Sequence, residues 1–437
     1  MKKFFKYALM FAMAITMGAG FTSCSDDDDD DDSAARAEEQ NTAISSITSV
    51  YLNSVVYPTY SSLASETENL YNLISALKTK LKAGTTVEQS EINAICESYL
   101  AARNYWEESE AFLYGAASDF EIDPHIDTWP LDVATLATDL NNDTKIAALD
   151  ESDGIEYARE NLTAENLGFH GIEFIFFRNG SPRDVAIFNN DAVEDYSYQG
   201  TNYFSGMNVT GKEEVIFATA VAGDLRDKCF QLEVAWEGSS APAAHIERVA
   251  TCAASSDDFQ TVTNKGGISY GEDLLAAGQT SSTQASWKKV METILVSGCS
   301  NICAEVADQK MGQAYRSATG QAGDEDDPNY IESPYSYNSF TDFYDNIISI
   351  KNCLYGNLDG TTWSSNSVMA YLVTYNSEMA TELNSRLNTA LSALQACKDS
   401  GTPFVLDPGA SYVNTAMQAV NSLDDYLNSA SSWILAN

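Results

Sequence analysis

Apolar side chains recur every three or four residues through most of the chain after position 40. One series is Leu70, Ile74, Leu77 and Leu81, and a second runs from Leu383 to Leu394. Further series of the same kind lie at residues 95–113, 215–236, 290–307, 340–354 and 417–435. A period near 3.6 residues is typical of helices that bury one face. The pattern therefore predicts an all-α protein.

Segments rich in turn-forming residues separate these series. They lie at residues 82–86, 119–130, 179–212, 238–242 and 320–334. About 400 residues follow position 40, which is more than one hydrophobic core usually supports. We therefore expect two antiparallel helical bundles, one over residues 41–205 and the other over residues 206–437.

The first 23 residues have the composition of a bacterial lipoprotein signal peptide. A basic start at Met1–Lys6 precedes a mostly apolar stretch at Tyr7–Thr22, and Cys24 follows small residues. Segments of this kind are removed on export. We expect cleavage before Cys24 and lipid attachment to that cysteine, which would anchor the mature protein to a membrane. A retained helical anchor is the alternative.

Seven consecutive aspartates, Asp26–Asp32, follow Cys24 almost at once. Because like charges repel one another, such a run is typical of an extended, solvated segment. We expect residues 24–40 to form an acidic tether. The run resembles the export signal of Bacteroidetes-type lipoproteins. That resemblance implies an outer-membrane lipoprotein exposed at the cell surface, with a periplasm-facing anchor as the alternative.

The chain is strongly acidic, with 63 Asp and Glu against 24 Lys and Arg and a net charge of −39. Binding to nucleic-acid phosphates depends on Lys and Arg side chains that displace counterions. A surface of this sign repels phosphate backbones and anionic lipid headgroups. The composition therefore argues against nucleic acid as a partner, whereas cations remain candidate ligands.

Eight cysteines are present, and Cys24 leaves seven for the folded part of the chain. The seven contain no CxxC pair, and a core of this size needs no disulfide framework. We expect them to be buried apolar side chains, with disulfide pairing as the alternative. They are Cys96, Cys229, Cys252, Cys299, Cys303, Cys353 and Cys397.

The most informative stretch contains His170, one of only three histidines in 437 residues. Glu173 follows at i+3, and residues 155–177 have the pattern of one helix, on which such positions are neighbours. Gly168 and Gly171 leave space for a facing helix. An imidazole and a carboxylate on one face can chelate a metal ion or share a proton. The alternative is a structural hydrogen bond.

Four blocks in order carry a family resemblance. Gly168, His170 and Glu173 match the pattern GxHxxE. Residues 102–115 contain an acidic helix that ends at an aromatic-glycine step, and residues 127–132 contain a Trp-Pro turn. The second half contributes residues 305–311, 332–336 and 340–352. With these blocks the chain resembles the imelysin family, described as insulin-cleaving metallopeptidases and grouped with periplasmic iron-uptake components.

The resemblance implies two four-helix-type bundles with a site in the cleft between them. His170 and Glu173 would lie there with Glu110 as a third metal ligand. Arg103 from the second helix, with Lys310 and Ser336 from the C-terminal half, would line the same cleft. Arg103 and Lys310 could instead form ordinary salt bridges. Trp106 and Trp129 are expected to pack in the core.

A zinc peptidase needs three protein ligands and an open position for water. Its inverted motif HxxEH is incomplete here because position 174 is Phe, and His125 and His245 lie in other regions. Gly-x-Ser-x-Gly is also absent. The sequence therefore gives no complete catalytic motif, and we expect no enzyme activity.

The residues together indicate an exported, lipid-anchored protein that binds a divalent metal or a small metal-bearing ligand in iron acquisition. Mixed nitrogen and oxygen ligands suit iron first, with zinc and manganese as alternatives. An outer-membrane uptake protein would be its partner. The competing hypotheses are a metallopeptidase and a non-catalytic surface interaction protein, the latter suggested by 23 tyrosines. An aromatic patch remote from His170 would favour the last.

Overall fold

The computed structural model describes residues 27–437, with side chains from residue 34 onward. Cys24 and the predicted signal peptide lie outside these residues. The chain divides into two units after Thr42, and the larger unit, Ala43–Asn437, contains the charged cluster and the cavity described below. In the described part, β-structure is limited to two short hairpins, β1–β2 and β3–β4, and one isolated bridge between Val193 and Thr210. The prediction of an all-α protein is therefore confirmed.

The segment expected to be an extended tether is helical where the structure describes it. Helix α1 spans Asp27–Tyr51 and therefore includes most of the aspartate run. Two effects favour the helix. Negative charge is stabilised near a helix N-terminus, and the following residues are mostly strong helix formers such as Ala and Glu. A tethering role for residues 24–40 stays a prediction.

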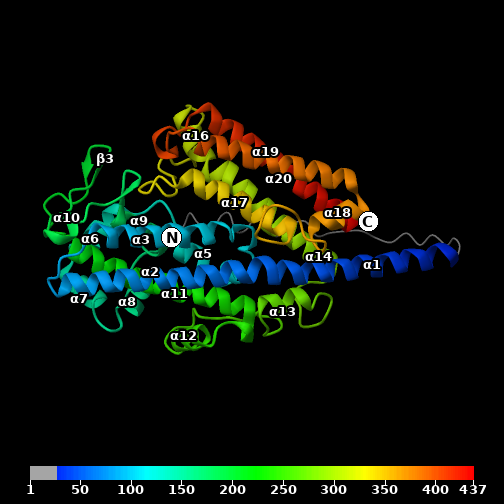
Figure 1. Ribbon diagram of the computed structural model, residues 1–437, viewed down its shortest axis with the longest axis horizontal. Helices are drawn as coiled ribbons and strands as arrows, with labels where there is room; N and C mark the ends of the chain where they lie inside the picture. Colours follow the sequence, from blue (N-terminus) through cyan, green and yellow to red (C-terminus); the bar gives the residue numbers. More distant parts are fainter. Residues whose placement is uncertain (1–26) are drawn as a thin grey trace. The chain divides into compact units, whose positions relative to one another are not determined.

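Long helices from the first 240 residues pack around α11 (Gly211–Glu237). Helix α2 (Tyr57–Lys82) lies along α11 and along α3 (Gln89–Glu107), as Figure 1 shows. Helices α8 (Gly154–Asn161), α9 (Gly168–Phe176) and α12 (Ala243–Ala253) also contact α11. These neighbours surround α11, which explains why apolar residues occur on all of its faces.

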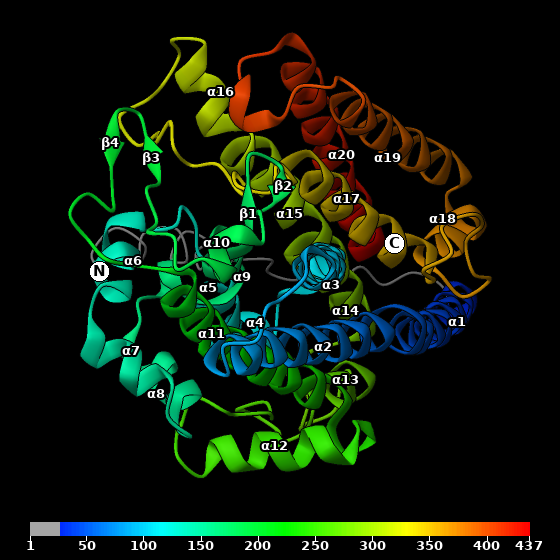
Figure 2. The same ribbon diagram turned by 60° about the vertical axis from the view of Figure 1, so that its left-hand side comes forward.

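A second group forms around α20 (Ser411–Ala436). It contacts α19 (Ser377–Lys398), which packs on α17 (Ser339–Tyr355) and α18 (Val368–Tyr375), as Figure 2 shows. A continuous helical run from Trp287 to Ala318 also contacts α20. This run is long and apolar enough to cross a membrane, but 61% of its most apolar window is buried inside the fold. Burial of this kind is typical of a core helix.

The remaining helical elements are short. Within the Trp287–Ala318 run they are α14 (Trp287–Glu292), π-helix η6 (Thr293–Ser300), α15 (Asn301–Ala304), π-helix η7 (Glu305–Lys310) and α16 (Gly312–Ala318). Elsewhere they are η2 (Leu52–Val56), η3 (Glu110–Phe112), α4 (Ala116–Asp119), α5 (Ile122–Ile126), α6 (Val133–Leu140), α7 (Asp143–Leu149), η4 (Ala164–Asn166), α10 (Ala186–Asn189), η5 (Gly238–Ser240), α13 (Tyr270–Leu275) and η8 (Phe404–Leu406). The strands are β1 (Phe177–Arg178), β2 (Ser181–Pro182), β3 (Ser197–Tyr198) and β4 (Thr201–Asn202).

The boundary expected between residues 205 and 206 stays a prediction. Helix α11 follows that boundary in sequence but packs on α2 and α9, which precede it. The seven cysteines after Cys24 are all buried and unpaired, as expected.

The single helix expected over residues 155–177 is wrong. Helix α8 ends at Asn161, and α9 begins only at Gly168. Gly168 has φ +61°, and a Cβ there would lie 1.8 Å from the backbone oxygen of Ile126. Glycine at this position therefore permits the turn into α9 and brings the start of α9 against the end of α5. This contact places His170 beside Asp127.

Helices α3 and α17 are joined by a buried polar contact that should give the protein a measurable pH dependence. Asn104 Nδ2 donates to Asp345 Oδ2 at 2.9 Å. Burial raises the pKa of Asp345 to about 6, although the bond from Asn104 opposes that shift. Between pH 4 and 6 the native state therefore holds a proton that the unfolded chain has lost. Stability falls as pH rises through this window.

We expect Asp345→Asn to remove that loss, because an amide fills the same space without charge. Its advantage over wild type should reach on the order of 2–3 kcal/mol at pH 8 and vanish near pH 4. Urea unfolding at several pH values would measure it. Parallel pH profiles for the two proteins would show that Asp345 titrates normally.

A buried cluster of charged side chains around His170

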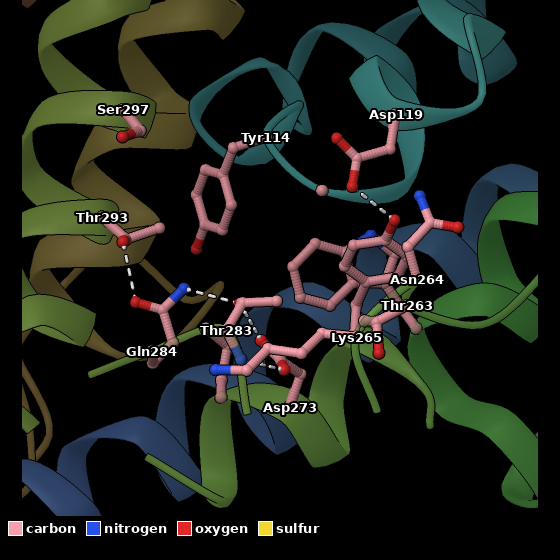
Figure 3. A pocket seen from close by; sticks show the side chains of 14 residues that line it. Tyr114, Asp119, Thr263, Asn264, Lys265, Asp273, Thr283, Gln284, Thr293 and Ser297 are labelled. Carbon is pink, nitrogen blue, oxygen red and sulfur yellow. Dashed lines mark hydrogen bonds between the residues drawn. The ribbon is translucent and has the colours of Figure 1, made fainter. Parts of the chain in front are cut away.

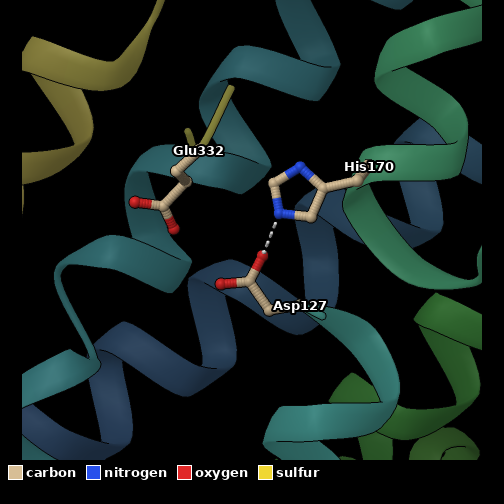
Figure 4. Close-up of side chains that lie close together, drawn as sticks. All are labelled: Asp127, His170 and Glu332. Carbon is tan, nitrogen blue, oxygen red and sulfur yellow. Dashed lines mark ion pairs between the residues drawn. The ribbon is translucent and has the colours of Figure 1, made fainter. Parts of the chain in front are cut away.

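His170 is fully buried on α9, where its ring faces two carboxylates. Its Nε2 atom lies 3.1 Å from Asp127 Oδ1, and its Nδ1 atom lies 3.6 Å from Glu173 Oε2. Neither ring nitrogen makes a hydrogen bond. Figure 4 shows the imidazole turned toward the carboxylates of Asp127 and Glu332. The GxHxxE motif thus meets acids from two other parts of the chain.

Glu173 is held by the loop that precedes α17. Its Oε1 atom accepts hydrogen bonds from the backbone amides of Tyr335 (3.0 Å) and Ser336 (2.7 Å). The hydroxyl of Ser336 donates to the same oxygen at 2.7 Å. Three donors on one oxygen fix the carboxylate, and its second oxygen faces His170. Ser336 is therefore beside Glu173, and Glu173 is placed to orient the imidazole.

Arg103 is the centre of the cluster. It lies on α3 and pairs with Asp127, and both side chains are buried from water. Its guanidinium also lies 2.5 Å from both Glu107 and Glu332. Arg103 therefore forms salt bridges, as the alternative expected, and it pairs with three buried acids at once. A second donor to Asp127 is the indole Nε1–H of Trp106, at 2.7 Å.

Lys310, at the end of η7, is the second buried cation. Its ammonium lies 3.1 Å from Glu332, 3.5 Å from Glu107 and 3.6 Å from Glu110. It also lies 5.1 Å from the ring centroid of Trp129. Glu110 therefore belongs to the cluster, where it pairs with Lys310 and not with His170.

All six candidate side chains expected from the sequence lie in this one cluster. Four acids that the sequence analysis did not assign connect them: Glu107, Asp127, Glu332 and Asp342. Each lies inside or beside one of the family-like blocks, so position within a block was the available signal. Three overlapping groups bring ligand atoms within 4.8 Å of one another: Asp127, His170 and Glu332; Glu107, Glu332 and Asp342; Glu107, Glu110 and Asp127.

The cluster buries more acids than bases. Six carboxyl groups (Glu107, Glu110, Asp127, Glu173, Glu332 and Asp342) surround Arg103, Lys310 and His170. Burial raises the pKa of Glu332 to about 7, against the opposing effect of Lys310. Burial likewise holds the pKa values of Glu110 and Asp342 well above the usual range. This surplus of negative charge favours a bound proton or a bound cation.

Asp127 and His170 form a pair in which each side chain favours the charged form of the other. Burial disfavours the charged form of Asp127, but Arg103 and His170 outweigh it and lower its pKa. Burial also disfavours the charged imidazole, yet Asp127 and Glu173 raise the pKa of His170 to about 9. The pair therefore holds a proton at neutral pH, and a metal ion bound by Asp127 and His170 would take the place of that proton.

Buried polar atoms that make no hydrogen bond indicate that the cluster fits a cation. Both nitrogens of His170 and one carboxylate oxygen each of Glu110, Glu173 and Glu332 are buried without a hydrogen bond. Leaving such atoms unpaired costs about 1–3 kcal/mol each. A cation among Asp127, His170 and Glu332 would satisfy the imidazole and Glu332 together.

The other two histidines are engaged elsewhere. His125 Nε2 lies 2.6 Å from Asp224 Oδ2, and His245 pairs with Glu233. The buried cluster therefore contains a single imidazole.

Comparisons with known proteins agree with this arrangement. The sequence model of the family described as imelysin matches residues 56–429. The chain is 25% identical to iron-regulated protein A of Synechococcus elongatus over 379 residues, which covers 86% of this chain and 83% of the relative.

Two solved structures share the fold. A crystal structure named as an iron-regulated protein A precursor from Parabacteroides distasonis has a TM-score of 0.67 at 23% identity, over 90% of this chain and 95% of that one. An imelysin-like protein from Psychrobacter arcticum has a TM-score of 0.52 at 15% identity, over 90% and 93%.

Proposed function

The chain belongs to the imelysin family, and from the contacts of its buried cluster we propose that it binds an iron ion through Asp127, His170 and Glu332. One observation carries the proposal. Ligand atoms of these three residues lie within 4.8 Å of one another, and the buried imidazole of His170 faces the two carboxylates with Nε2 3.1 Å from Asp127.

The neighbouring residues have supporting roles in this proposal. Glu173 faces Nδ1 of His170, so Nε2 is the nitrogen that faces the ion. Carboxylates that orient a ligating imidazole in this way typically change metal affinity by about 10–100-fold when removed. Arg103 and Lys310 hold Glu332 and its neighbours in place by ion pairs. Glu107 and Glu110 offer further oxygen atoms within 4.8 Å of Asp127.

Iron is the proposed cargo for two reasons. One imidazole with two carboxylates suits Fe, whereas Zn and Mn are alternatives with similar ligands. The relative from Synechococcus elongatus is named an iron-regulated protein, which supports a role in iron acquisition. An outer-membrane uptake protein is the proposed partner.

Calorimetric titration of the mature protein with Fe(II), Mn(II) and Zn(II) under anaerobic conditions tests the proposal. We expect one Fe(II) site per chain, and Glu332→Gln should weaken it. Glu68→Gln, on the exposed face of α2, is the matched control and should leave it unchanged. Equal Fe(II) affinity for wild type and Glu332→Gln would reject this ligand set.

We also propose that the protein is an outer-membrane lipoprotein anchored through Cys24 and exposed at the cell surface. Acyl chains on one cysteine hold a protein firmly to a bilayer when more than one is present. Wild-type protein should therefore enter the detergent phase of a Triton X-114 partition. Cys24→Ala should move most of it to the aqueous phase or leave it unprocessed. Wild type in the aqueous phase would contradict the anchor.

A further inference from the structure

A second candidate site lies in a cavity that shares no residue with the charged cluster. The cavity has a volume of about 390 Å³. Its walls come from the end of α11, the α4 and α13 segments, the loops at residues 263–265 and 283–284, and one side of η6. Figure 3 shows polar side chains from several of these elements around one space. The volume lies near the lower end of the range for small-molecule pockets, roughly 300–1,000 Å³.

Two buried polar atoms of the wall have no partner. Trp236 is completely buried and Thr263 is 3% exposed, yet neither the indole Nε1–H nor the threonine hydroxyl makes a hydrogen bond. Both residues line the cavity. A polar ligand that accepts from Trp236 and exchanges a hydrogen bond with Thr263 would remove the cost of two unpaired groups.

The walls are held in place by their own hydrogen bonds. The phenol of Tyr270 donates to Asp119 at 2.6 Å, and Thr293 donates to Gln284 at 3.2 Å. Both oxygens of Asp273 accept from Thr283. These contacts are visible in Figure 3. The cavity is therefore preformed, which reduces the entropy lost on binding.

Charge and chemistry narrow the ligand class. Lys265 is the one cation among the lining residues, and its ammonium already donates to the carbonyl of Ser282. Two carboxylates, those of Asp119 and Asp273, line the same wall, so its charge disfavours an anion such as phosphate. An apolar ligand would leave Trp236 and Thr263 unpaired. A neutral molecule with many hydroxyl groups suits this wall, because each hydroxyl both donates and accepts.

We propose that this cavity binds a mono- or disaccharide. Its hydroxyls would accept from Trp236, pair with Thr263 and donate to the free carboxylate oxygen of Asp119. The apolar faces of the sugar ring would lie on the aromatic side chains of Tyr114 and Tyr270, which combine a large apolar surface with a polar end. The proposal is independent of the iron site, because the two share no residue.

Saturation-transfer NMR with glucose, galactose, N-acetylglucosamine and maltose, each at about 10 mM, tests it. We expect wild type to bind at least one of the four. Thr263→Val keeps the shape of the side chain and removes its hydroxyl, so it should weaken binding about fivefold to tenfold. Ser297→Trp places a large ring in the cavity from an exposed position on η6 and should abolish binding.

Ser429→Trp is the matched control, because Ser429 is exposed on α20 and does not line the cavity. It should bind as wild type does. Circular dichroism would confirm that each variant is folded. Failure of all four sugars to bind wild type would overturn the proposal, and so would binding that persists in Ser297→Trp.

Discussion

Arg103→Met should destabilise the protein by about 3–5 kcal/mol at pH 8, the usual cost of removing one partner from a buried ion pair. Arg103 is completely buried and contacts Asp127, Glu107 and Glu332. Without it, these carboxylates would keep their desolvation cost and lose their main counter-charge. Urea unfolding would measure the difference. Lys80→Met, which breaks a half-exposed pair with Glu91, should cost at most about 1 kcal/mol.

The same variant should recover stability in acid. In the variant, protonation neutralises the carboxylates that have lost Arg103 as their partner. Burial already raises the pKa of Glu332 to about 7 in the wild type. The deficit of Arg103→Met relative to wild type should therefore shrink as pH falls from 8 to 5. A loss below about 1 kcal/mol at pH 8 would mean that water or other cations replace the guanidinium.

His170→Ala should lower the affinity for Fe(II) by about 100-fold or more, since it removes the only imidazole, and so the only nitrogen ligand, of the proposed site. Glu173→Gln should lower it about tenfold, because it orients the imidazole without being one of the three proposed ligands. The double variant should bind Fe(II) only slightly more weakly than His170→Ala does, since both changes act on the binding of the ion by the imidazole. Anaerobic titration calorimetry would measure all three.

His245→Ala is the matched control, since it removes a histidine that pairs with Glu233 outside the cluster. It should bind Fe(II) as wild type does. Unchanged affinity in His170→Ala would mean that the imidazole has a structural role. Effects of His170→Ala and Glu173→Gln that simply add would show that the two residues act independently.

The helical architecture could be predicted because its signal is local. The series Leu383 to Leu394 became the buried face of α19, and Leu70 to Leu81 became that of α2. The break between α8 and α9 was missed, and so was the close approach of Gly168 at the start of α9 to Ile126, which is a contact with another segment. The contacts of α11 with α2 and α9 were not predicted either, because they join segments that are far apart in the sequence.

The site was predicted in part. His170 and Glu173 were found because their spacing places them on one helical turn. Asp127 and Glu332 were not assigned, although they lie nearest to the imidazole and to Arg103. Their acidic type is common in a chain with 63 Asp and Glu, so composition could not single them out. Only tertiary folding brings them to His170.

The ion pair between Arg103 and Glu332 joins residues 229 positions apart, and this separation has a consequence for synthesis. A nascent chain that ends before residue 332 contains His170 and Asp127 but lacks the third acid. Long-range contacts of this kind form late, because closing so large a loop costs entropy before any contact compensates for it. An incomplete or proteolytically shortened chain would thus lack the proposed binding site, so that iron could be retained only by molecules that had finished both translation and folding.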